Sequence, residues 1–199
     1  MPAGDEVNRK LLVVVVAAAA VLALLAGAAV GRNLLSPSDP PTRRADVVRF
    51  KDPVAKVSIA YPASWTRLPD RPQEPDLALL AAVDDSTSLL MRISPSGLDG
   101  GVTVRTLPVV RGFTDDLVKA DPRAKQLADP VAVVAGGLPG WRYRYTYGSG
   151  DSGGAHDHYF LFKDKQLIQL VFQAVPAERL ATLAPVFDSI AASFRGRDA

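Results

Sequence analysis

The chain has 199 residues, of which 48% are hydrophobic and 22% charged, with a formal net charge of +2 at pH 7. These averages are typical of a globular protein, but residues 11–30 contain neither a charged nor a polar side chain. A helix of that length, rising about 1.5 Å per residue, covers a hydrocarbon core of about 30 Å. The segment therefore argues against a wholly soluble cytoplasmic chain.

The predicted plan consists of a head (1–10), a transmembrane helix (11–30), a Pro-rich linker (31–45) and one globular domain (46–199). A cleaved signal peptide is the alternative, because Ala26-Gly27-Ala28 has the small-residue pattern of a cleavage site. The chain would then be secreted after cleavage near Ala28. The apolar run continues without interruption to Val30, which favours an uncleaved single-span anchor.

The surplus positive charge lies in the linker. From Asp46 onward the chain has eighteen basic and eighteen acidic side chains. The linker contains three arginines, Arg32, Arg43 and Arg44, and only one acidic residue. The pI near 9.0 is thus no argument for a nucleic-acid partner. Beside a bilayer the three arginines favour contact with anionic lipid, at about 1 kcal/mol each.

Orientation is predicted on a different argument. The linker arginines do not support an external domain by the positive-inside rule, but long domains translocate largely regardless of charge. A ten-residue head also leaves no room for a cytoplasmic function. We expect the domain outside the cytoplasm, with a cytoplasm-facing regulatory domain as the alternative. The absence of cysteine excludes disulfides, thiolate catalysis and a lipid-modified anchor.

Alternating and helical hydrophobic patterns predict the elements of the domain. Strands are expected at 47–50, 57–61, 77–83, 89–93, 131–135, 141–147, 159–163 and 167–174. One helix is expected from Leu107 or Val110 to Ala120, and a second from Leu180 to Phe194, where Pro185 should kink it or begin its second half. This order predicts an α+β fold with a mainly antiparallel sheet flanked by helices.

Two stretches of the sequence carry a resemblance to a known family. The first is Ile59-Ala60-Tyr61-Pro62-Ala63-Ser64-Trp65, a strand that ends in a Tyr-Pro-x-x-Trp turn, and the second runs from Tyr159 to Arg195. They are similar to the opening strand and turn, and to the last hairpin and terminal helix, of the PsbP-like superfamily. The superfamily includes an accessory subunit of photosystem II, a Ran-binding import factor and bacterial exported proteins and lipoproteins. The resemblance implies an α/β/α sandwich with a binding or accessory role, and it supplies no catalytic residues.

A serine-protease motif occurs in the sequence without the context that catalysis requires. Gly150-Asp151-Ser152-Gly153-Gly154 matches the segment around a nucleophilic serine, which requires a histidine as base. His156 and His158 follow it closely, whereas the chymotrypsin order places the base far upstream, and a strand rather than a helix follows the serine. We expect a turn at 148–155 and no catalysis. A secreted or tethered hydrolase that uses Ser152 and His156 is the alternative.

The same region suggests two binding hypotheses. His156 and His158 are two residues apart on a strand and share a face, and Asp151 could approach them, but this set is incomplete as a metal site. We expect neither metal nor cofactor. Arg142 and Arg144 alternate with aromatic residues, which predicts that the aromatic side chains point into the core and the arginines into solvent. The two arginines are the candidates for a partner-binding face.

Together these features predict a single-pass, membrane-anchored accessory or binding domain of the cell envelope. Its expected partners are the bilayer, through 11–30, and an unidentified envelope protein or small ligand.

Overall fold

The structure is a computed structural model that describes residues 46–148 and 153–196. The predicted span at 11–30, the linker, Asp151 and Ser152 lie outside these residues. Within the described part of the chain, no helix has both the length and the apolar character needed to cross a bilayer.

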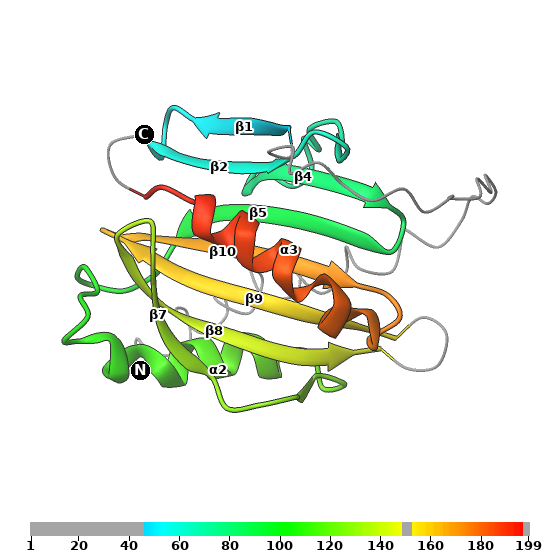
Figure 1. The fold of residues 1–199 in the computed structure, drawn as a ribbon. Coiled ribbons are helices and arrows are strands. Elements are labelled where there is room, and N and C mark those ends of the chain that lie inside the picture. Colours follow the sequence, from blue (N-terminus) through cyan, green and yellow to red (C-terminus); the bar gives the residue numbers. More distant parts are fainter. Residues whose placement is uncertain (1–45, 149–152, 197–199) are drawn as a thin grey trace, which may run out of the picture.

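A single antiparallel sheet forms the centre of the domain (Figure 1). Its strands follow the order β3 (Thr66–Arg67), β4 (Leu77–Asp84), β5 (Thr87–Pro95), β10 (Gln166–Ala174), β9 (Gly154–Lys163), β8 (Leu138–Tyr147) and β6 (Lys125–Gln126), and β7 (Val131–Ala135) also pairs with β8. Every pairing is antiparallel. The longest strands lie in the middle of the sheet, so the helices pack on a continuous sheet surface.

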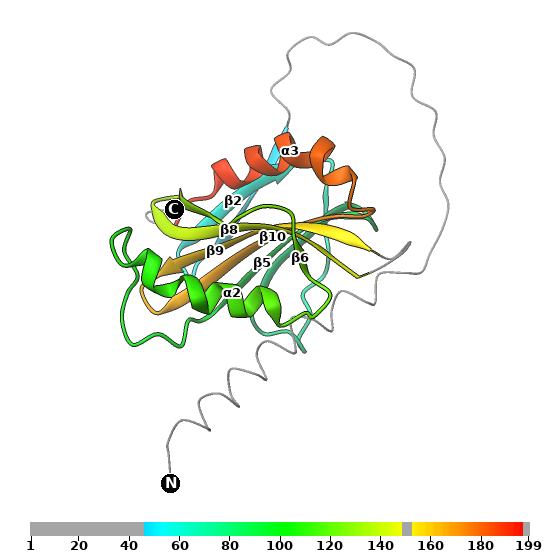
Figure 2. The same ribbon diagram turned by 90° about the horizontal axis from the view of Figure 1, so that it is seen from below.

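Helices cover both faces of this sheet (Figure 2). On one face lies α3 (Arg179–Ser193), beside the separate hairpin of β1 (Val47–Asp52) and β2 (Val57–Pro62). On the other lies α2 (Arg111–Lys119), which follows the short 3-10 helix η2 (Leu107–Val110). The predicted α+β fold with a mainly antiparallel sheet and flanking helices is confirmed.

The apolar stripe of α3 forms the larger core. The ring of Phe187 stacks on Phe172 of β10 at 5.0 Å between centroids, and it meets Trp65 edge-on at 6.4 Å. The helix runs through Pro185, so the proline removes a backbone donor without ending the helix. Trp65 is placed by the Tyr-Pro-x-x-Trp turn, in which its amide donates to the carbonyl of Pro62 at 2.9 Å.

The end of the chain closes the inner edge of β2. Arg195 and Ser58 exchange both backbone hydrogen bonds, at 2.8 and 3.0 Å. The amide of Ala60 donates to the Ser193 hydroxyl at 2.8 Å. These bonds satisfy backbone groups of β2 that no strand pairs, and they attach the hairpin to α3.

Candidate functional site

Strands β8 and β9 carry the described residues that the sequence singled out, and their pairing separates two groups. Arg144 lies opposite Asp157, whereas Tyr145 lies opposite His156 and Tyr143 opposite His158. Because side chains alternate across a strand, the arginines and Asp157 face α3, and the histidines face α2. The sheet therefore divides one polar sequence into two unrelated sites.

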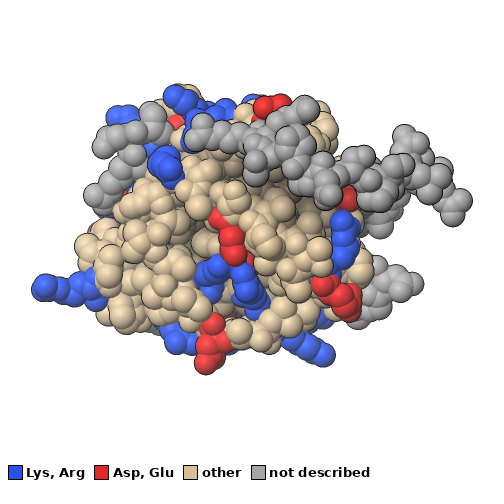
Figure 3. Space-filling view, in the orientation of Figure 1, with Lys and Arg blue, Asp and Glu red and all other residues tan. Residues whose placement is uncertain are grey.

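On the α3 face, one carboxylate holds two arginines. Asp157 is fully buried, and its oxygens accept hydrogen bonds from Nε of Arg142 at 2.6 Å, from Nη2 of Arg142 and from Nε of Arg144 at 3.1 Å. Asp188 of α3 binds Nη2 of Arg142 from outside at 2.5 Å. Acidic and basic side chains meet at the centre of this face (Figure 3). We name Arg142, Arg144, Asp157 and Asp188 the ion cluster.

The expectation that these arginines lie in solvent holds only in part, because Arg144 is 38% exposed whereas Arg142 is largely covered. The side chain of Arg142 is only 20% exposed and its guanidinium lies over the ring of Tyr159, 4.9 Å from the centroid. Burial would lower the pKa of Arg142, but the hydrogen bonds and charge of Asp157 raise it above its ordinary value. The prediction assumed that one face of β8 is open to solvent. Helices cover both faces of this sheet (Figure 2), and an ion pair can be buried beneath a helix as well as an apolar side chain can.

On the α2 face, Tyr145 joins the two histidines. Its hydroxyl lies 3.0 Å from Nδ1 of His158 and 3.1 Å from Nδ1 of His156, and Nε2 of His158 lies 3.2 Å from Oε1 of Gln169. A single hydroxyl proton can be donated to only one ring, so the other ring donates to the tyrosine and the two tautomers are opposite. The arrangement is a chain of neutral hydrogen-bonding groups.

Burial keeps both imidazoles neutral. It lowers the pKa of His156 to about 3, and it holds the pKa of His158 well below its ordinary value. The sequence placed these residues at the polar start of a strand after a turn at 148–155. Instead β9 begins at Gly154 and both rings are buried. Among the described residues no three His, Cys, Asp or Glu side chains are placed to hold a metal.

The geometry of His156 also bears on the hydrolase alternative. A general base at neutral pH needs a pKa near 7 and a carboxylate that orients it. The imidazole of His156 has a pKa of about 3, and a phenol rather than a carboxylate contacts its Nδ1. These two features disfavour His156 as the base for Ser152.

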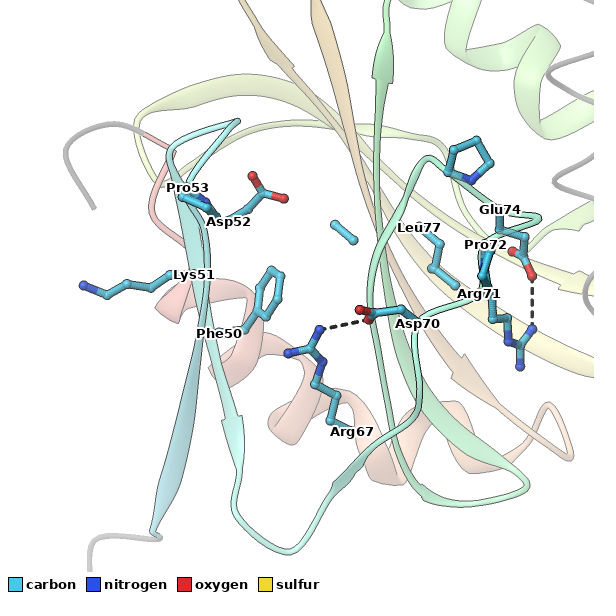
Figure 4. A pocket seen from close by; sticks show the side chains of 12 residues that line it. Phe50, Lys51, Asp52, Pro53, Arg67, Asp70, Arg71, Pro72, Glu74 and Leu77 are labelled. Atoms are coloured by element: carbon cyan, nitrogen blue, oxygen red, sulfur yellow. Dashed lines mark hydrogen bonds and ion pairs between the residues drawn. The ribbon is translucent and has the colours of Figure 1, made fainter.

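A groove of about 450 Å³ opens between the β1–β2 hairpin and the segment that leads from β3 into β4 (Figure 4). Its lining combines apolar groups with six charged side chains, and comprises Phe50, Lys51, Asp52, Pro53, Arg67, Asp70, Arg71, Pro72, Glu74, Pro75, Leu77 and Ala78. Its volume lies within the range of about 300–1,000 Å³ that is usual for ligand sites.

The charges of this groove are largely matched. Arg67 pairs with Asp70 at 3.0 Å and also lies 5.1 Å from the ring centroid of Phe50. Arg71 pairs with Glu74 at 3.2 Å, and Glu74 reaches Arg92 of β5 at 2.5 Å. Arg92 is buried, so this carboxylate ties the groove wall to the sheet. The result is a groove whose wall combines apolar side chains with paired charges of both signs.

The sequence pattern did not indicate this groove. Its lining comes from two segments separated by β2, and neither contains a known motif. The density of proline between 69 and 75 is a local signal of a rigid loop, but it does not show which surface lies opposite.

Comparison with known proteins shows similarity in structure but not in sequence. No family model matches the chain, and no curated protein matches it. The solution structure of the cyanobacterial PsbP protein of Synechocystis sp. PCC 6803 superposes with a TM-score of 0.58 at 18% identity, over 80% of this chain and 97% of that one.

Two further structures extend the comparison. LpqN of Mycobacterium tuberculosis, described as involved in cell envelope biogenesis, gives a TM-score of 0.55 at 16% identity, over 70% of this chain and 82% of that one. The Ran-binding protein Mog1p of Saccharomyces cerevisiae gives 0.46 at 8% identity, over 77% and 97%. Identities this low establish the fold alone. The resemblance seen in the sequence is confirmed at that level: the domain has the PsbP-like fold.

Proposed function

We propose that this protein is a single-pass membrane protein whose domain lies outside the cytoplasm and binds a protein of the cell envelope, without catalysis of its own. The observation that carries the proposal is the groove between the β1–β2 hairpin and β4. The fold supports a role in the cell envelope, because it is shared with LpqN, a protein involved in cell envelope biogenesis. The apolar segment 11–30 supports the anchor.

The chemistry of the groove suits a protein segment. Aromatic, proline and arginine side chains supply contact area, and arginines and aromatics are enriched at the centres of interfaces. Ion pairs within the groove wall leave it nearly neutral, so a polyanion would find no unmatched row of cations there. An extended segment with apolar side chains and one or two charges of either sign fits this surface.

Topology is tested with protease added to intact cells that carry the full chain. Digestion of the domain without lysis is the expected result. Protection until lysis would overturn the external placement and favour the cytoplasm-facing alternative.

Groove binding is tested by photocrosslinking in the same cells. A photoreactive amino acid at Asp70, in the groove wall, should give a discrete adduct with an envelope protein, whereas the same group at exposed Val109 in η2 should not. The adduct should be lost in Arg67→Glu and retained in Arg111→Glu. Arg111 is a matched control, because its side chain is 44% exposed against 46% for Arg67 and it also lies over an aromatic ring. Equal adducts at both positions would refute the groove.

A further inference from the structure

Strand β7 forms an open edge of the fold. It pairs with β8 through Val131–Ala135, and no described strand lies on its other side. Its sequence Val-Ala-Val-Val-Ala has no charged or polar side chain. Val131 is 58% exposed and Val134 is 62% exposed, so apolar side chains as well as backbone groups face outward. Such an edge is a template for pairing with another strand.

Four other edge strands of the described fold, β1, β2, β3 and β6, carry protections that β7 lacks. Both β3 and β6 are two residues long and each carries a basic side chain. The outer edge of β1 carries Arg49 and Lys51, and the inner edge of β2 is closed by the end of the chain. Charges, short strands and covering segments are the usual protections against edge pairing. Only β7, among these described edges, combines a length of five residues with no charge.

We infer that β7 is a self-association edge, at which two copies of this chain pair antiparallel about a two-fold axis through Val133. In this register Val133 meets its own equivalent, Val131 meets Ala135, and Ala132 meets Val134. Every cross-strand pair is then small and apolar, and each contributes favourably in an antiparallel ladder.

Two-fold symmetry is the reason for choosing a second copy as the partner. An isologous interface brings each surface against itself, so a charge near the axis would meet the same charge. No residue from Val131 to Ala135 carries one, and the domain from Asp46 onward has equal numbers of acidic and basic side chains. Neither local nor overall repulsion therefore opposes pairing of two copies.

The test uses the full chain in membrane vesicles and depends on its lack of cysteine. In V133C, the only thiol of each copy lies at the axis. Directly opposed residues have Cβ atoms about 4.5–5.5 Å apart, close to the distance of about 3.5–4.5 Å that a disulfide spans. Mild oxidation should give a dimer of two identical chains. The control V48C places a thiol on the exposed but charged strand β1 and should remain monomeric.

A second variant separates pairing from folding. V134K adds a charge at an exposed position, so V133C/V134K should keep the unfolding temperature of V133C and lose the dimer. Three results would overturn the inference: no dimer in V133C, equal dimer in V48C, or a disulfide to a different protein. Retention of the dimer in V133C/V134K would also overturn it, because each lysine would lie opposite Ala132 of the other copy and diagonal to the second lysine, where the like charges repel and the edge is blocked.

Discussion

Replacing Asp157 with asparagine tests whether the ion cluster stabilises the domain. The substitution keeps the size of the side chain but removes the charge that Arg142 and Arg144 share. Removing one partner of a buried ion pair costs about 3–5 kcal/mol. Both arginines reach water in part, with side chains 20% and 38% exposed, so we expect the lower end, about 3 kcal/mol. For a chain of this size that lowers the melting temperature by about 6–12 °C.

The assay is thermal and urea unfolding of the full chain in detergent, followed by circular dichroism. Asp188→Asn is the matched control, because it removes a carboxylate of the same cluster that is 50% exposed. Exposed ion pairs contribute about 0–1 kcal/mol, so this variant should lose little stability. Arg142→Met in the Asp157→Asn background should cost less than the sum of the two single changes, because it removes a cation left without its partner.

Two results would refute this reasoning. Equal losses in Asp157→Asn and Asp188→Asn would show that burial of the carboxylate is not what matters. Additive losses in the double variant would show that Arg142 and Asp157 do not act as a pair.

The remaining predictions concern pH and packing. Because His156 and His158 have lowered pKa values when folded, the unfolded chain binds more protons as pH falls below about 6.5, and unfolding free energy should drop by about 1.4 kcal/mol per pH unit for each. Denaturant titrations between pH 6 and pH 5 measure this slope, and an unchanged slope in His156→Asn would contradict it. Gly140→Ala should destabilise by more than about 2 kcal/mol, because its Cβ would lie 2.2 Å from a carbonyl oxygen of β9. Gly112→Ala in α2, with no atom within 4 Å, should instead stabilise by up to about 1 kcal/mol, and the same urea unfolding compares the two. Phe187→Ala should cost about 3–5 kcal/mol in that assay, since its ring is fully buried, and a loss below that of Asp188→Asn would contradict the assigned core.

Hydrophobic patterns within single segments were sufficient to predict most of the helices and strands. The helical spacing before Ala120 became η2 and α2, and the alternating run at 167–174 became β10 with one residue added. Two strands, β3 and β6, were missed because two residues carry no periodicity and are strands only through their partners.

The candidate sites depended on contacts between distant residues. Nothing local to Asp157 indicates that it is buried, because Arg142, Arg144 and Asp188 reach it from β8 and α3. The groove likewise forms only because the β1–β2 hairpin lies opposite the proline-rich segment before β4. A pattern in one segment reports which side chains share a face, but not what covers that face.

For this protein the sequence by itself determined the α+β class, the succession of the longer strands and the helices along the chain, and the electrical neutrality of the domain from Asp46 onward. These follow from periodicity and composition, which need no knowledge of neighbours. Only the tertiary structure decided that the arginines of β8 are partly buried, that the histidines of β9 are neutral and that β7 is an open edge. Whether a side chain is buried, and whether a strand edge is paired, depends on which other segments pack against it. Those segments are distant in the sequence and come together only in the folded sheet and its covering helices.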